Sequence, residues 1–161
     1  MEPLQIKISI LEQRLFLVGP NAVLKSWSIS SAERGVGEQN GSGCTPRGLH
    51  QIAEKLGAEA PTNTVFVARQ ATGEIYSAAL AHAYPDRDWI LTRILWLKGC
   101  EPGVNQGDDV DSYNRYIYIH GTPDSEPMGV PRSHGCIRMR NKDVIELFDQ
   151  TEVGTEVRIE E

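Results

Sequence analysis

Alternation of apolar and polar side chains runs through most of the chain and predicts a protein built mainly from β-strands. Residues 4–10 place an apolar side chain at every second position, which is the period of a strand with one buried face. Further strands are expected at residues 14–18, 22–29, 49–56, 64–70, 74–79, 89–97, 115–120 and 155–159. The pair 64–70 and 74–79 resembles a hairpin whose turn is Ala71-Thr72-Gly73.

One segment departs from this period and predicts a helix near the C-terminus. Val144, Ile145 and Phe148 form an apolar stripe, and Asn141 is a suitable N-cap for a helix that begins there. A chain of 161 residues can bury one sufficient hydrophobic core, and no repeat or linker divides it. We therefore expect one mainly β (α+β) domain over residues 1–161.

Charge and hydropathy argue against two classes of binding partner, nucleic acids and membranes. Sixteen Lys and Arg against 22 Asp and Glu give a net charge of −6, which argues against a nucleic-acid-binding surface. No apolar run approaches the roughly 18 residues of a membrane helix, so no membrane partner is expected. Residues 1–7 lack the pattern of a secretory signal, and three cysteines without a CxxC pair suit reduced thiols. These features predict a cytoplasmic protein.

The candidate chemistry gathers in two short motifs, Ile119-His120-Gly121-Thr122 and Ser133-His134-Gly135-Cys136-Ile137-Arg138-Met139. A cysteine attacks as the thiolate, and a neighbouring imidazole can take the thiol proton. His120 and His134 are both candidates for that role beside Cys136. Gly135 would let a substrate carbonyl approach the backbone, whose N–H groups around Cys136 could form an oxyanion hole. These residue types indicate acyl transfer.

Four cations close to Cys136 are out of character in an acidic chain: Arg132, Arg138, Arg140 and Lys142. Positive charge of this density would favour the thiolate and hold the pKa of Cys136 below that of an ordinary thiol. Arginine also binds carboxylates through two parallel hydrogen bonds. The expected substrate is therefore anionic, with Ser133, Arg132 and Arg138 as the candidate substrate-binding residues.

The two motifs resemble those of the YkuD-type L,D-transpeptidase family, in which a histidine precedes a glycine-containing loop and Ser/Thr-His-Gly-Cys. Residues 120–122, 128–129 and 133–139 follow this order, and Thr45-Pro46-Arg47-Gly48 is similar to an upstream motif of the family. The resemblance covers most of the chain and implies a β-sandwich-like catalytic domain.

The same resemblance implies a role for each residue of the motifs. Cys136 would be the nucleophile and His120 its base, while the backbone carbonyl near Gly121 orients the imidazole. His134 would then be a secondary residue. Family members attack the bond before the terminal D-alanine of a murein tetrapeptide and form a thioacyl-enzyme.

The acceptor then decides the product. An amine acceptor would give a 3→3 cross-link, whereas water would give a trimmed tripeptide. Because no secretory signal is visible, we favour the hypothesis of an L,D-carboxypeptidase. It would act on soluble murein tetrapeptide fragments during peptidoglycan recycling. An L,D-transpeptidase is the alternative.

Two further classes compete with thiol chemistry. His120, His134 and Cys136 are acceptable zinc ligands, so a metallo-hydrolase is one alternative. The sequence shows no HExxH motif and no paired CxxC, so neither a metal nor another cofactor is expected. A non-catalytic module that binds murein peptides is the other alternative, although it would not need Cys136.

Overall fold

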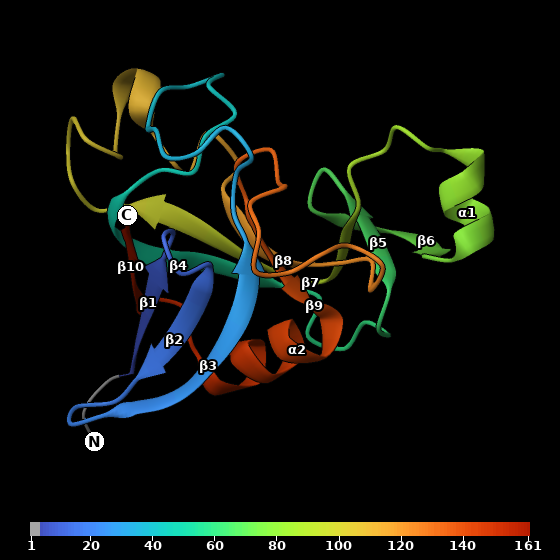
Figure 1. Ribbon diagram of the computed structural model, residues 1–161, viewed down its shortest axis with the longest axis horizontal. Helices are drawn as coiled ribbons and strands as arrows, with labels where there is room; N and C mark the ends of the chain where they lie inside the picture. The colour runs from blue at the N-terminus through green and yellow to red at the C-terminus, as the bar shows by residue number, and fades with distance from the viewer. Residues whose placement is uncertain (1–3) are drawn as a thin grey trace.

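The structure is a computed structural model that describes residues 4–161, and it confirms the mainly β fold with a helix near the C-terminus (Figure 1). The elements along the chain are β1 (Gln5–Ser9), β2 (Arg14–Val18), β3 (Val23–Ser30), β4 (Gly48–Leu56), β5 (Thr64–Val67), β6 (Gln70–Ile75), α1 (Ala78–Ala83), β7 (Ile90–Gly99), the 3₁₀ turn η1 (Asp108–Val110), β8 (Tyr118–Thr122), β9 (Ile137–Arg140), α2 (Asn141–Gln150) and β10 (Glu156–Glu160). All nine sequence segments expected to form strands contain or overlap a strand of the structure.

The strands form one sheet that closes on itself. Their order is β4-β10-β1-β2-β3-β9-β8-β7-β5-β6, and an additional pairing joins β4 to β7. That pairing closes eight strands into a barrel-like ring and leaves β5 and β6 as a hairpin attached to β7. In Figure 1 this hairpin and α1 stand on the side of the molecule away from β1 and β2.

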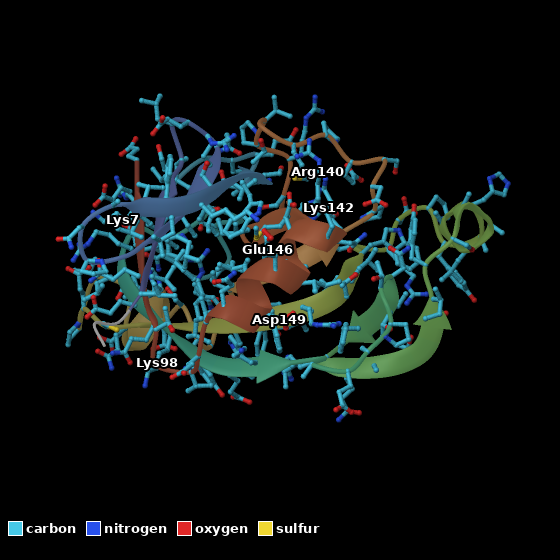
Figure 2. The ribbon with its side chains drawn as sticks, turned by 90° about the horizontal axis from the view of Figure 1, so that it is seen from below. Lys7, Lys98, Arg140, Lys142, Glu146 and Asp149 are labelled. Atoms are coloured by element: carbon cyan, nitrogen blue, oxygen red, sulfur yellow. The ribbon has the colours of Figure 1, made fainter. Side chains whose placement is uncertain are left out.

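The core follows from the two-residue period of the strands. Ile6 and Ile8 of β1 are at most 1% exposed, and their neighbours in the sequence point the other way. The apolar side of α2, with Val144, Leu147 and Phe148, packs into the same core. Figure 2 shows the other side of α2, which carries charged residues along the helix. The helix is therefore amphipathic, as the stripe predicted.

Two predictions for the β5–β6 region are wrong in detail. The hairpin turns at Ala68 and Arg69 rather than at residues 71–73, because Val67 pairs with Gln70. The expected strand at 74–79 ends early, and α1 begins at Ala78. Ser77 caps this helix, since its Oγ atom accepts a hydrogen bond of 3.1 Å from the Leu80 N–H. A cap followed by an alanine-rich run favours helix over strand.

The predicted N-cap of α2 is also wrong, because Arg140 occupies that position and Asn141 is the first helical residue. The side chain of Asn141 is buried in contacts with other elements. Its Nδ2 atom donates to the Thr122 carbonyl at 3.0 Å, and its Oδ1 atom accepts from Thr92 Oγ1 at 2.6 Å. Asn141 therefore ties β7, β8 and α2 together beside the predicted site. Across residues 4–161, none of the helices has the length and apolar character needed to span a membrane.

Candidate active site

The parallel pairing of β8 with β9 brings the two motifs together. Ile119 lies opposite Ile137, and His120 lies opposite Arg138. Both isoleucines are fully buried in the main core. Because side chains alternate along a strand, His120 and Arg138 project from the other face, and Cys136 immediately before β9 lies against that face as well.

His120 is held in one tautomer by the backbone next to it. Its Nδ1 atom lies 2.6 Å from the Gly121 carbonyl oxygen, which can only accept, so Nδ1 carries the proton. The ring is 1% exposed, and this burial lowers the pKa of His120 below its usual value near 6.5. A neutral imidazole with an unprotonated Nε2 is therefore available as a base. This is the carbonyl contact that the family resemblance implied.

Glycine is the only residue type that fits at position 121. A Cβ atom there would lie 2.4 Å from Asn141 Oδ1 and 2.7 Å from the Leu91 carbonyl oxygen. Its own carbonyl meanwhile orients His120. The hydrogen bonds of Asn141 with Thr92 and Thr122 thus fix the strand that carries His120.

Cys136 is half-buried, and backbone groups contact its sulfur. The thiol donates to the Tyr116 carbonyl at 3.3 Å, and the Tyr118 N–H donates to Sγ at 3.3 Å. Burial raises the pKa of Cys136 to about 12, although the Tyr118 N–H and the charges of Arg138 and Arg115 act in the opposite direction. The prediction of a lowered pKa is therefore wrong. At rest the site holds a neutral thiol and a neutral imidazole.

The expected cationic patch does not surround the sulfur. Arg138 is buried and neutralised, since its Nη2 atom lies 3.1 Å from Asp88 Oδ1 and its Nη1 atom 3.9 Å from Glu126 Oε2. Arg132 is exposed. Figure 2 shows Arg140 and Lys142 together at the start of α2, where both are exposed to solvent. These four cations are close to Cys136 in the sequence, but in the structure they do not combine into one positive patch around its sulfur.

The backbone before Cys136 is locked by hydroxyl groups. Ser133 Oγ donates to the Cys136 carbonyl at 2.5 Å and accepts from the Gly135 N–H at 3.2 Å. Gly135 has a φ of +134°, a conformation that side chains disfavour. Thr45 Oγ1 donates to the Gly135 carbonyl at 2.9 Å. Ser133 therefore shapes the turn, and the Gly135 N–H is already engaged rather than open to an oxyanion.

His134 lies at the surface, apart from these contacts. Its side chain is 70% exposed, and its Nδ1 atom lies 3.5 Å from Asp88 Oδ2. Asp88 was missed at the sequence level because it lies in the polar stretch 85–88, which carries no motif. Burial opposes ionisation of Asp88, but His120, Arg138 and His134 together hold its pKa below the usual value. One carboxylate thus links three predicted site residues.

No three histidine, cysteine or acidic side chains in residues 4–161 come close enough to hold a metal ion. His120, His134 and Cys136 therefore do not form the ligand set that the zinc alternative requires. The geometry instead places a thiol, an imidazole in one fixed tautomer and the ion pair of buried Arg138 with the more exposed Asp88 on one side of two parallel strands. A thiol and an imidazole are the groups that a cysteine-dependent acyl transfer requires.

Comparison with known proteins shows the family to which the chain belongs. The family model described as "YkuD: L,D-transpeptidase catalytic domain" matches residues 3–159, so the chain belongs to this family. A probable L,D-transpeptidase, YcfS of Escherichia coli strain K12, is 27% identical over 96% of this chain and 43% of its own length. The putative L,D-transpeptidase YkuD of Bacillus subtilis strain 168 is 54% identical over 26% of this chain and 25% of its own. The chain thus spans less than half the length of these curated relatives.

Solved structures share the fold at low sequence identity. The L,D-transpeptidase of Xylanimonas cellulosilytica superposes with a TM-score of 0.57 at 20% identity, covering 99% of this chain and 61% of that one. The structure of the L,D-transpeptidase LdtMt1 in complex with imipenem gives a TM-score of 0.60 at 19% identity, with coverages of 99% and 59%. These matches agree with the β-sandwich-like domain expected from the motifs.

Proposed function

We propose that Cys136 is the nucleophile of an L,D-bond-cleaving acyl transfer and that His120 is its base. One observation carries the proposal: the oriented imidazole on β8 and the thiol immediately before β9 lie on the same side of these two parallel strands, opposite the main core. Membership of the L,D-transpeptidase family supplies the substrate class, which is the peptide part of peptidoglycan.

The chemical steps follow from the resting state. His120 Nε2 takes the proton from Cys136 as sulfur attacks the carbonyl carbon before the terminal D-alanine. The C–N bond then breaks, the amine of D-alanine receives the proton from His120, and a thioester remains on the sulfur. Because both groups start neutral, the charged pair exists only while the reaction proceeds.

We propose hydrolysis as the second half of the reaction. Water needs only the His120 base beside the thioester, whereas an amine acceptor must also be bound in a site of its own. The products are D-alanine and a tripeptide. Hydrolysis suits trimming of soluble murein tetrapeptide fragments in the cytoplasm, the location expected from the sequence, and fractionation of cells tests that location.

Transpeptidation is the second candidate, and one cavity favours it. A space of about 330 Å³ lies beside His134 and Arg138. Its lining contains four carboxylates, of Glu33, Asp86, Asp88 and Glu126, and three guanidinium groups, of Arg87, Arg132 and Arg138. Asp88 and Glu126 are paired with Arg138, whereas Glu33 and Asp86 form no ion pair within residues 4–161. The amine of an acceptor peptide could therefore pair with Glu33 or Asp86, which makes the cavity a candidate acceptor site.

Mass spectrometry of the products separates these outcomes. A soluble tetrapeptide is incubated with the protein, with and without a large excess of an amine acceptor. We expect tripeptide and D-alanine in both samples, and a dominant acceptor-linked product would reverse the assignment in favour of transpeptidation. Cys136→Ala serves as the control, and an active Cys136→Ala protein rules out the mechanism. Imipenem gives a second test, with a covalent adduct expected on the wild-type protein and none on Cys136→Ala.

A further inference from the structure

The tip of the β5–β6 hairpin holds an arginine in an unfavourable backbone conformation. Ala68 and Arg69 have φ values of +48° and +65°, the left-handed values that a two-residue hairpin turn requires at both central positions. Glycine and asparagine normally supply such turns, and other residues pay roughly 1 kcal/mol or more each for this conformation. The side chain of Arg69 is therefore placed at a conformational cost, which makes its contacts informative.

Arg69 lies against a group of four aromatic side chains, here called the aromatic platform: Trp96, Tyr113, Tyr116 and Tyr118. Its guanidinium carbon is 5.1 Å from the ring centre of Trp96 and 4.5 Å from that of Tyr116. Its Nη1 atom donates to the Tyr118 hydroxyl at 3.3 Å. Stacking on rings holds the planar fork in one orientation and leaves its other N–H groups available.

The aromatic platform also contacts the candidate nucleophile. Cys136 packs against the cluster that contains Trp96 and Tyr118. The Tyr116 carbonyl accepts from the thiol, and the Tyr118 N–H donates to the sulfur. Arg69 and Cys136 thus contact the same two tyrosines, although they are 67 positions apart in the sequence.

The other arginines near the sulfur are already engaged within the protein. Arg138 is paired with Asp88, and Arg115 donates to the carbonyls of Gly37, Glu38 and Cys44. Arg69, in contrast, makes no ion pair with any residue in 4–161, and the Tyr118 hydroxyl is its one hydrogen-bond partner there. Its charge is therefore open to an anionic ligand on the side of the site where the aromatic platform lies.

We propose that Arg69 binds a carboxylate of the donor peptide and so holds its reacting carbonyl beside Cys136. This inference rests on the proposed function and replaces Arg138 as the carboxylate-binding residue expected from sequence. Two groups of a stem peptide share the required chemistry. One is the terminal carboxylate of D-alanine, and the other is a side-chain carboxylate on the diamino acid in third position. Either can take two parallel hydrogen bonds from a guanidinium.

Steady-state kinetics with matched peptides test this assignment. The donor set comprises a tetrapeptide with both carboxylates, the same peptide amidated at its C-terminus, and one whose diamino acid lacks the side-chain carboxylate. For Arg69→Gln we expect KM to rise about tenfold or more on peptides that carry the recognised carboxylate, with kcat little changed, corresponding to about 1.4 kcal/mol of binding. The peptide without that group should be insensitive to the substitution, which identifies the carboxylate. Arg69→Lys should restore binding in part, since it keeps the charge and loses the fork.

Arg158→Gln on β10, also the loss of one arginine charge, controls for net charge and should leave KM unchanged. If Arg69→Gln weakens all three peptides equally, Arg69 only supports the aromatic platform, and the inference is overturned while the proposed function stands. If the wild-type protein cleaves none of the peptides, the proposed function fails and the inference fails with it.

Discussion

Thr45 and Gly135 are 90 residues apart in the chain, yet Thr45 Oγ1 donates a 2.9 Å hydrogen bond to the Gly135 carbonyl. The same hydroxyl accepts a 2.9 Å bond from the Ala32 N–H, and Thr45 is fully buried. Because Gly135 directly precedes Cys136, this threonine fixes the backbone that carries the thiol. Thr45 of the upstream motif Thr45-Pro46-Arg47-Gly48 thus positions the backbone next to Cys136 and supplies no reacting group.

Thr45→Val tests that relationship, because valine keeps the shape and removes both hydrogen bonds. We expect kcat/KM for the tetrapeptide to fall at least about tenfold, since small misplacements of a reacting group are costly. The free energy of unfolding should fall by about 1–3 kcal/mol, the cost of a buried group left unpaired. Urea denaturation and steady-state kinetics provide the measurements. Thr45→Ser keeps the hydroxyl and should stay close to wild type, while a fully active Thr45→Val protein would show that the hydroxyl does not position Cys136.

Gly121→Ala should damage both the fold and the orientation of the base. Its Cβ atom would meet Asn141 Oδ1 at 2.4 Å and the Leu91 carbonyl at 2.7 Å, so β8 must move. We expect a loss of about 1–3 kcal/mol or more, typical of overpacking, and a loss of activity beyond it in the folded fraction. Gly19→Ala is the matched control, because φ at Gly19, as at Gly121, is not left-handed, and the new Cβ would meet only the flexible Leu24 side chain, at 3.4 Å. Equal effects of the two substitutions would show that crowding at Gly121 is not decisive.

The sequence was informative wherever the signal was local. Period-2 alternation located every strand except β9. The two motifs singled out Cys136 and His120 as candidates, and the structure places both on the same side of β8 and β9. The Gly121 carbonyl followed from the family resemblance. Each of these signals lies within a few neighbouring residues.

Contacts between segments that are distant in the sequence could not be predicted, because no local pattern reports them. Asp88 and Arg69 come from loops without a motif, and they join the site only through the packing of β7 and β8. The four cations near Cys136 in the sequence led to a wrong prediction of a positive patch around its sulfur. In the structure Arg138 is paired with Asp88, and Arg140 lies at the start of α2. The pKa of Cys136 depends mainly on burial, which a one-dimensional charge pattern does not report.

Acid should destabilise the protein through His50, which the sequence left without a role. His50 is fully buried, with Nε2 2.8 Å from Ser112 Oγ and Nδ1 3.0 Å from the Gly48 carbonyl oxygen. Burial lowers its pKa from 6.5 to about 4. Between these values the unfolded state binds more protons, so stability present above pH 6.5 is lost as the pH falls toward 4. The loss should approach about 3 kcal/mol, at about 1.4 kcal/mol per pH unit.

Urea denaturation between pH 7.5 and 4 measures this dependence. In His50→Gln the amide can still bond to Ser112 but does not titrate, so the contribution of His50 to the slope should disappear. A slope unchanged by His50→Gln would assign the acid sensitivity to other groups, among them the buried His120.

Asp88→Asn should shift the pH dependence of activity. His120 accepts a proton only when it is neutral, so kcat/KM declines as the pH falls through the pKa of His120, which burial places below 6.5. The Asp88 charge raises that pKa, and its removal should therefore move the acid limb to still lower pH. Arg138 also loses its carboxylate partner, so kcat should fall. Asp149→Asn, on the outer side of α2, controls for the change in net charge, and an acid limb that does not move in Asp88→Asn would separate Asp88 from the base.

Alkylation of Cys136 should be slow at neutral pH, because the resting thiol is protonated. Burial raises its pKa to about 12, and alkylating agents react with the thiolate. The low thiolate fraction is offset in part by the higher intrinsic nucleophilicity of a more basic thiolate. Together these effects predict a rate about 100-fold below that of free cysteine at pH 7, rising without a plateau beyond pH 8.5.

Mass spectrometry of iodoacetamide-treated protein from pH 6 to 10 measures this rate, with Cys44 and Cys100 replaced by alanine to leave one thiol. Stability should show the same linkage. A thiol whose pKa is raised by folding stabilises the fold below about pH 8.5, its unfolded value, and this contribution is lost as the pH rises toward 12. A rate that reaches a plateau near pH 6 to 7 would reveal a preformed thiolate–imidazolium pair between Cys136 and His120. Transfer of the proton would then precede substrate binding, and the neutral resting state inferred from burial would be wrong.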